Sequence, residues 1–194
     1  MLKVIFVDLG GLLVKEGYTT GIRDFAVSQK FNQEDFFAAC HDYKYWKDFT
    51  LGLISEEEYF QEIEKIFGKK FDWRELQRYI QNHTELKEDV LSLLKKLKKD
   101  FILGTISNHP SEWYKWTKIF FGLEKLFDIE VVAGIVHKRK PDPSIFKFAI
   151  DKAGMPAKEI IYIDDSDKHF SGALTVGMNV AKCSTIEEIK RALF

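Results

Sequence analysis

The sequence has few cysteines, and their spacing carries no recognisable motif. Only Cys40 and Cys183 occur among 194 residues, which is too few for a disulfide framework and lacks the paired spacing of a zinc site. The formal net charge is only −1, so the overall field offers little attraction to nucleic acid or to an anionic membrane. We therefore expect a small-molecule partner, no nucleic acid, and a reduced cytoplasmic setting.

Long apolar runs are also absent. No window approaches the roughly 18 uncharged apolar residues that a membrane-spanning helix needs, so we expect no membrane span. The apolar stretch after Met1 is interrupted by Asp8 and is not followed by a small-residue cleavage site, which argues against a signal peptide. Internal repeats and low-complexity tracts are lacking as well.

Aromatic residues, in contrast, are abundant. The chain contains 17 Phe, 7 Tyr and 4 Trp, and 45% of its residues are hydrophobic. Burial at roughly 25 cal/mol per Å² of apolar area makes such side chains the main stabilising contribution. The length and composition fit one sizeable core, or a core domain with a small insertion. Among the aromatic residues, Tyr43, Trp46 and Phe49 could line the entrance of a site.

Short apolar runs rich in Ile, Val and Phe recur along the chain, separated by segments of helical length. Runs of this kind predict strands of a parallel sheet joined by right-handed crossovers. We therefore expect an α/β fold with a doubly wound parallel sheet and a Rossmann-like core. The predicted strands cover residues 4–7, 101–106, 129–132, 160–163 and, more weakly, 179–181.

Several segments carry helix signals. The pairs Ser55 with Glu58 and Ser184 with Glu187 predict capping boxes. Residues 86–97 have apolar side chains at helical spacing, with interleaved lysines on a solvated face. Three amphipathic helices are predicted earlier in the chain, over residues 24–47, 55–67 and 73–82.

The first two predicted strands are separated by about 90 residues, far more than one crossover helix requires. We interpret residues 15–82 as a small all-helical cap that is inserted after the first strand, beside the site. Residues 1–14 and 83–194 then form the α/β core.

The first apolar run ends in an acid that is followed by glycines. Asp8 comes directly after Val7, and Gly10 and Gly11 follow at once. An isolated carboxylate at the carboxyl end of a strand, next to residues that allow close backbone approach, is typical of a nucleophile or a metal ligand.

Further polar groups follow the later runs. Ser107 ends the second run, and Lys140 lies in a cationic loop before a helix whose free N–H groups favour an anion. Asp164 and Asp165 end the fourth run. Two adjacent acids that face Asp8 across the sheet edge need a cation, and oxygen ligands of this kind suit Mg²⁺.

Asp8, Ser107, Lys140 and the pair Asp164-Asp165 resemble, in this order, the four motifs of the haloacid dehalogenase-like (HAD) hydrolase superfamily. The resemblance spans the whole chain and points to the phosphatase-like branch with a helical cap. It implies an enzyme, a Mg²⁺-dependent phosphohydrolase that acts on a small phosphorylated metabolite.

The resemblance also implies roles for individual residues. Asp8 would attack the phosphorus atom to form an aspartyl-phosphate, while Ser107 and Lys140 hold the transferring oxygens; these three are the expected catalytic residues. The implied metal ligands are Asp8, the backbone carbonyl of Gly10, Asp164 and Asp165, and the expected substrate contacts are Gly11, Asn108 and His109.

Gly10 departs from the family pattern, in which a second acid stands two residues after the nucleophile. That acid normally protonates the leaving group and activates water, which is worth about 10²- to 10⁴-fold in rate. We therefore expect weakened turnover unless the leaving group needs little protonation or another group substitutes. His109 and His137 are the candidates, because a histidine titrates in the useful range. His169 stands where many members have Asp or Asn.

Two alternatives stay open. Gly10 is the feature that favours a non-catalytic descendant, which would bind a phosphorylated ligand or a partner protein through the same pocket. The second alternative is a 2-haloacid dehalogenase, but the pair Asp164-Asp165 argues against it, because a metal-free site gains nothing from two neighbouring anions. Neither the substrate nor the oligomeric state follows from these motifs.

Overall fold

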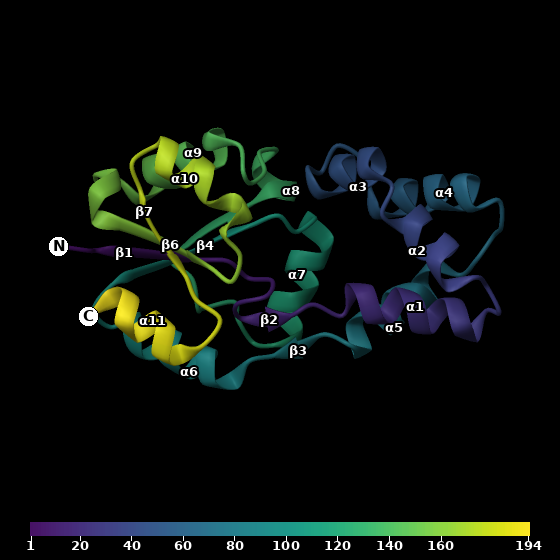
Figure 1. The fold of residues 1–194 in the computed structure, drawn as a ribbon, viewed down its shortest axis with the longest axis horizontal. Helices are drawn as coiled ribbons and strands as arrows, with labels where there is room; N and C mark the ends of the chain where they lie inside the picture. Colours follow the sequence, from purple (N-terminus) through teal and green to yellow (C-terminus); the bar gives the residue numbers. More distant parts are fainter.

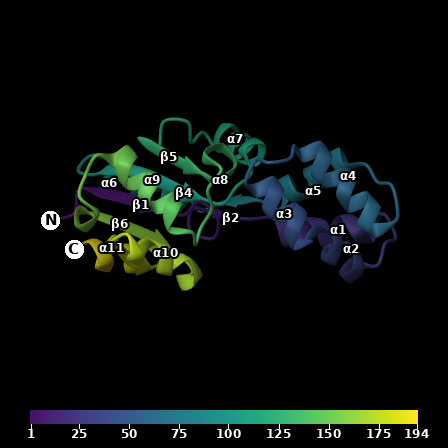
Figure 2. The same cartoon turned by 90° about the horizontal axis from the view of Figure 1, so that it is seen from above.

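The computed structural model describes the backbone of residues 1–194 and every side chain except that of Tyr43. Figure 1 shows an α/β part, which carries both chain termini, beside an all-helical part, and Figure 2 shows the same separation from above. Among the described residues, none of the helices combines the length and the apolar character of a membrane span.

The α/β part is built on a five-stranded parallel sheet in the described part of the chain. Its strands are β1 (Val4–Val7), β4 (Ile102–Ser107), β5 (Ile129–Val132), β6 (Ile160–Asp164) and β7 (Asn179–Lys182). The spatial order is β5-β4-β1-β6-β7, so the chain leaves β1 toward β4 on one side and later reaches β6 on the other. The predicted doubly wound sheet is confirmed, and its switch point lies at the carboxyl ends of β1, β4 and β6, where such sheets bind ligands.

Helices cover both faces of the sheet, as parallel strands require. The side chains of β1 alternate between them: Ile5 and Val7 pack into one buried apolar cluster, whereas Val4 and Phe6 pack into another. The helices of this part are α6 (Glu88–Leu97), α7 (Ser111–Phe120), α8 (Ala133–Val136), α9 (Pro143–Ala153), α10 (Phe170–Thr175) and α11 (Ile186–Leu193), with short 3-10 helices at Ala157–Glu159 and Asp167–His169.

The all-helical part has an aromatic core of its own, in which Phe25, Phe36 and Tyr59 are fully buried. Its helices are α1 (Tyr18–Ser28), α2 (Gln33–Cys40), α3 (Tyr43–Thr50), α4 (Glu56–Phe67) and α5 (Trp73–Asn82).

The prediction of one helix over residues 24–47 is wrong, because the chain turns twice within that segment. Lys30 has a left-handed backbone with φ of 55°. The side chains of Asn32 and Asp42 then accept hydrogen bonds from free backbone N–H groups and start α2 and α3. Because each of these two side chains caps the start of a new helix, the segment forms separate helices instead of a continuous one.

The two segments that join the parts run side by side. They form a short antiparallel pair, β2 (Val14–Lys15) and β3 (Glu85–Leu86), in which Val14 lies opposite Leu86. The pair brings the residues that follow β2 to the edge of the sheet where β1 ends. The assignment of residues 15–82 to a separate cap domain stays a prediction.

The last helix begins one residue later than the sequence motif predicts. Thr185 Oγ1 accepts a hydrogen bond from the Glu188 backbone N–H at 3.3 Å, and the Glu188 carboxylate accepts one from Thr185 N–H at 3.2 Å. The predicted box of Ser184 with Glu187 is therefore wrong by one position, since α11 starts at Ile186. The box of Ser55 with Glu58 is confirmed.

The capping box of Thr185 with Glu188 leads to a prediction about stability. Thr185→Ala removes the hydroxyl that caps α11 and is expected to lower the free energy of unfolding by about 1 kcal/mol. Ser184→Ala is the matched control, because Ser184 bonds the Glu188 carboxylate through its backbone N–H, which the substitution keeps. Urea unfolding of both variants measures the difference, and an equal loss in the two would contradict the assignment.

Candidate active site

The carboxyl ends of three neighbouring strands bring Asp8, Ser107 and Asp164 to one edge of the sheet. All three are buried. Asp8 directly follows β1, and its backbone N–H donates to the Ile163 carbonyl of β6 at 2.9 Å, which extends the sheet pairing by one residue. Its side-chain Oδ1 accepts a hydrogen bond from Leu9 N–H at 2.8 Å. The orientation of the Asp8 carboxylate is thus fixed by the backbone that follows it.

A buried lysine joins two of these acids. Lys140 Nζ lies 2.7 Å from Asp8 Oδ2 and 3.3 Å from Asp164 Oδ2, and it donates a hydrogen bond to Tyr162 Oη at 2.6 Å. The backbone of Lys140 is held in turn by the side-chain amide of Asn108, which accepts from Lys140 N–H at 2.8 Å and donates to the Lys140 carbonyl at 3.1 Å. The amine is therefore fixed between the carboxylates.

The electrostatics of the three acids differ. Burial raises the pKa of Asp8, and Asp164 adds to this effect, while Lys140 opposes it. Burial and the nearby Asp164 likewise raise the pKa of Asp165. Burial alone would raise the pKa of Asp164 too, but a hydrogen bond from His169, the charge of Lys140 and a hydrogen bond from Tyr162 hold it well below its usual range. Burial is thus the main cause of the raised pKa of both Asp8 and Asp165, and Asp164 adds to it.

Two carboxylates and one imidazole come together at this edge, and the carboxylates fit a hard divalent cation. One ligand atom each from Asp8, Asp164 and His169 lie within 4.8 Å of one another. The Asp165 carboxylate lies against Gly11, because a Cβ atom at Gly11 would come within 2.4 Å of both of its oxygens. Gly11 also has φ of +78°, which side chains rarely adopt, so two constraints demand glycine here. Carboxylate oxygens are the ligands that Mg²⁺ prefers.

The three expected substrate contacts, Gly11, Asn108 and His109, already have partners in the protein, and those of Gly11 and Asn108 are with the backbone or with Lys87. Gly11 N–H donates to the Val14 carbonyl at 2.8 Å, and the Gly11 carbonyl accepts from Lys87 Nζ at 2.5 Å. The amide of Asn108 is engaged with the backbone of Lys140. Both residues line the cavity above the site, and their contact with a substrate stays a prediction.

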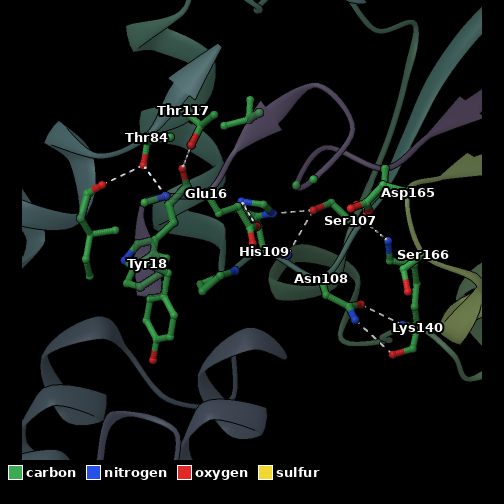
Figure 3. Close-up of a pocket in the computed structure, with 18 of the residues that line it drawn as sticks. Glu16, Tyr18, Thr84, Ser107, Asn108, His109, Thr117, Lys140, Asp165 and Ser166 are labelled. Carbon is green, nitrogen blue, oxygen red and sulfur yellow. Dashed lines mark hydrogen bonds and ion pairs between the residues drawn. The ribbon is translucent and has the colours of Figure 1, made fainter. Parts of the chain in front are cut away.

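The two candidate histidines lie in different places. His109 Nδ1 is hydrogen bonded to Ser107 Oγ at 2.6 Å, and its Nε2 lies 3.3 Å from Glu16 Oε1. Figure 3 shows the His109 ring between Glu16 and Ser107. His137 is exposed, and its Nδ1 bonds the Leu51 carbonyl at 2.8 Å. It is not among the described residues that line the cavity, so the structure does not bring it to the site.

Three residues of the site carried no assigned role in the sequence. Tyr162 bonds both Lys140 and Asp164, and His169 Nδ1 lies 3.0 Å from Asp164. The position of Tyr162 could have been inferred from the sequence, because it stands two residues before Asp164 and side chains two residues apart in a strand lie on the same face of the sheet. The position of Glu16 could not be inferred in this way, because it depends on how β2 packs against the rest of the protein.

A cavity of about 320 Å³ lies above these residues. Residues of both parts of the structure line it, including Tyr18 and Trp46 from the helical part and Trp113 from α7. The Tyr18 ring stacks on Trp46 with centroids 4.7 Å apart and lies 5.5 Å from Trp113. Of the aromatic residues considered for an entrance, Trp46 lines the cavity, Phe49 is fully buried, and the Tyr43 side chain lies outside the described residues.

A doubly wound sheet with a buried lysine and several acids at its switch point places these groups where α/β folds of this class bind their ligands. Residues 2–177 match the haloacid dehalogenase-like hydrolases, and the chain belongs to this family. The resemblance seen in the four motifs is thereby confirmed.

Individual relatives agree with this membership. The chain is 28% identical to flavin mononucleotide hydrolase 1 of Arabidopsis thaliana over 134 residues, which cover 69% of this chain and 54% of the relative. The chain thus spans about half the length of the curated relatives that it matches.

Solved structures show the same fold. A HAD family enzyme of Bacteroides thetaiotaomicron superposes with a TM-score of 0.83 at 23% identity, covering 100% of this chain and 98% of that one. A complex of the same enzyme with magnesium and inorganic phosphate has a TM-score of 0.73 at 23% identity and covers 93% of each chain.

Proposed function

We propose that this chain is a Mg²⁺-dependent phosphohydrolase that transfers the phosphoryl group of a small metabolite to Asp8 and then to water. The observation that carries the proposal is the buried Lys140 amine, 2.7 Å from Asp8 and 3.3 Å from Asp164 at the edge of the cavity. A fixed positive charge there keeps the nucleophile ionised and meets the oxygens of an arriving phosphoryl group. The solved magnesium and phosphate complex of the Bacteroides thetaiotaomicron enzyme supports the proposal.

The residues of the site divide the reaction into two displacements. In the first, an oxygen of Asp8 attacks phosphorus while the bond to the leaving oxygen breaks, which gives an aspartyl-phosphate. In the second, water attacks the same phosphorus and the Asp8 carboxylate is released. The Lys140 amine and the Ser107 hydroxyl donate hydrogen bonds to the transferring oxygens in both steps.

The cation would be held by Asp8, Asp164, Asp165 and the backbone carbonyl of Gly10. Bound there, Mg²⁺ supplies positive charge that offsets the phosphoryl oxygens and the neighbouring carboxylates. The raised pKa values of Asp8 and Asp165, caused mainly by burial and in part by Asp164, support this set, because a cation would relieve the repulsion that contributes to both shifts.

Residues 15–82 act in this proposal as a cap that contacts the leaving group. Tyr18 and Trp46 of the helical part and Trp113 of α7 present aromatic rings to the cavity. Flat apolar walls of this kind favour a leaving group that contains a planar ring. The name of the Arabidopsis thaliana relative, a flavin mononucleotide hydrolase, agrees with such a substrate.

Gly10 favours a second candidate, a non-catalytic protein that binds a phosphorylated ligand through the same pocket. Such a protein would bind phosphate but would never form a covalent bond to Asp8. Turnover and covalent trapping at Asp8 distinguish the two candidates.

The proposed activity is measured with a panel of phosphate esters, including flavin mononucleotide, sugar phosphates, nucleotides, acyl phosphates and an aryl phosphate. We expect Mg²⁺-stimulated release of phosphate that a chelator abolishes. Absence of turnover on every ester at saturating Mg²⁺ would overturn the proposal.

Loss of a carboxylate ligand tests the metal set. Asp165→Asn is expected to raise the Mg²⁺ concentration for half-maximal turnover by about tenfold or more, since even residues that only support the ligands have effects of that size. Asp167→Asn is the matched control, because Asp167 is exposed and faces Lys182 at 3.7 Å. An unchanged Mg²⁺ requirement in Asp165→Asn would contradict the assigned ligand set.

A further inference from the structure

The space beside Gly10 is filled by a carboxyl group from elsewhere in the chain. A Cβ atom at Gly10 would lie 2.2 Å from Glu16 Oε1 and 2.6 Å from Glu16 Cδ. The Glu16 carboxyl group therefore occupies the position where a side chain of residue 10 would begin. A side chain at position 10 and the present position of Glu16 exclude each other, so a larger residue at position 10 requires Glu16 to move.

The backbone around Glu16 is held firmly. Glu16 directly follows β2, and the next residue, Gly17, packs so closely that a Cβ atom there would lie 2.1 Å from the Ile80 carbonyl oxygen. Gly17 N–H also donates to Thr84 Oγ1 at 3.2 Å. These contacts anchor the chain beside Glu16, and Figure 3 shows Glu16 and Thr84 on the same side of the site.

The Glu16 side chain is about half exposed to solvent and lines the cavity that holds the reacting groups. It lines the same cavity as Asp8, and Glu16 Oε1 lies 3.3 Å from His109 Nε2, whose other ring nitrogen bonds Ser107. The side chain is 52% exposed, so water reaches its carboxyl group.

We propose that Glu16 is the proton donor and acceptor that the family otherwise places at the position of Gly10. This inference rests on the proposed phosphohydrolase function. When Asp8 attacks phosphorus and the bond to the leaving oxygen breaks, the carboxyl proton of Glu16 passes to that oxygen. When water then attacks the aspartyl-phosphate, the Glu16 carboxylate takes a proton from the water, and Asp8 leaves as a carboxylate. Glu16 ends the cycle protonated, as it began.

His109 acts in this arrangement as a positioning residue. Its two ring nitrogens bridge Ser107 and Glu16, so the imidazole fixes the distance between the phosphate-binding hydroxyl and the proton donor. The same contacts favour Glu16 over His109 as the donor, since both ring nitrogens of His109 already have partners.

Glu16→Gln keeps the shape of the side chain and removes its titrating proton. For an alkyl phosphate, whose leaving oxygen needs a proton, we expect turnover to fall by about 10²- to 10⁴-fold. For an aryl phosphate, the first release of the phenolate is expected to persist as a burst, whereas the slow second step makes aspartyl-phosphate accumulate on Asp8. Acid quenching with intact-protein mass measurement detects the adduct. Glu85→Gln is the matched control, because Glu85 is exposed and pairs with Lys15 outside the cavity.

A second test moves the proposed proton donor from position 16 to position 10, so the conclusion does not depend on a single variant. Glu16→Ala is expected to lose alkyl phosphate turnover, and Glu16→Ala combined with Gly10→Asp is expected to regain it, because the freed space admits the new side chain. Gly10→Asp alone is expected to bring no gain, since it displaces Glu16.

The outcomes separate the two proposals. Two results, in a wild-type protein that turns over, would overturn the role of Glu16 and leave the proposed function standing. One is unchanged alkyl phosphate hydrolysis in Glu16→Gln. The other is an equal loss on alkyl and aryl substrates without accumulation of the aspartyl-phosphate adduct. A wild-type protein that hydrolyses no ester would remove the proposed function and this role with it.

Discussion

Asp8→Asn is expected to abolish phosphate ester hydrolysis, with a loss of at least about 10⁴-fold, while the protein stays folded. An amide oxygen is a poor nucleophile, and no other described carboxylate takes the same place at the end of β1 beside Lys140. The pKa of Asp8 is raised, mainly by burial, so the folded protein holds this carboxylate in its ionised form at a free-energy cost. The melting temperature of Asp8→Asn should therefore equal or exceed that of the wild type.

Asp100→Asn is the matched control, because Asp100 is exposed beyond α6. It should leave both turnover and melting temperature unchanged. Residual turnover of Asp8→Asn within tenfold of the wild type would show that another group is the nucleophile. A large fall in melting temperature would show that the Asp8 carboxylate stabilises the fold.

Lys140→Ala is expected to have the largest effect on stability. The amine is buried between Asp8 and Asp164, and its removal leaves two buried carboxylates without their cation. Breaking a buried ion pair by removing one partner typically costs about 3–5 kcal/mol, because the remaining charge is uncompensated. Urea unfolding without added metal ion measures this loss.

Lys147→Ala removes an exposed lysine from α9 and serves as the comparison, with an expected change below about 0.5 kcal/mol. Added Mg²⁺ should recover part of the stability of Lys140→Ala, because a cation at the acids compensates the same charge. A loss below about 1 kcal/mol in Lys140→Ala would contradict the view that this amine holds the acids together.

The sheet could be predicted because its signals are local. The central run 4–7 is continuously apolar, and all of its residues are buried between two layers of helices. The order of polar groups along the chain then follows from topology, since parallel strands bring their carboxyl ends to one edge. This is why Asp8, Ser107 and Asp164 could be expected together.

The helical part was harder to predict because its boundaries depend on short caps. The amphipathic pattern runs continuously over residues 24–47, whereas the turn at Lys30 and the caps at Asn32 and Asp42 divide this segment into separate helices. The start of α11 has the same ambiguity, since Ser184 and Thr185 both fit a capping box and only the path of the chain selects Thr185.

Glu16 shows the limit of reading the site from the sequence. The absence of an acid at Gly10 is visible in the sequence, but the group that fills its space comes from the far side of a turn. The turn in which Val14 N–H donates to the Leu9 carbonyl, the pairing of β2 with β3 and the close packing of Gly17 together bring Glu16 there. No local pattern encodes that approach.

The most direct test of the central claim is a crystal structure of the protein with Mg²⁺ and beryllium fluoride, a mimic of the phosphoryl group. We predict beryllium bonded to an oxygen of Asp8, fluorine atoms facing Lys140 and Ser107, and Mg²⁺ beside the Asp165 carboxylate. A fluoride complex that occupies the cavity without a bond to Asp8, or a metal ion bound away from these acids, would contradict the account.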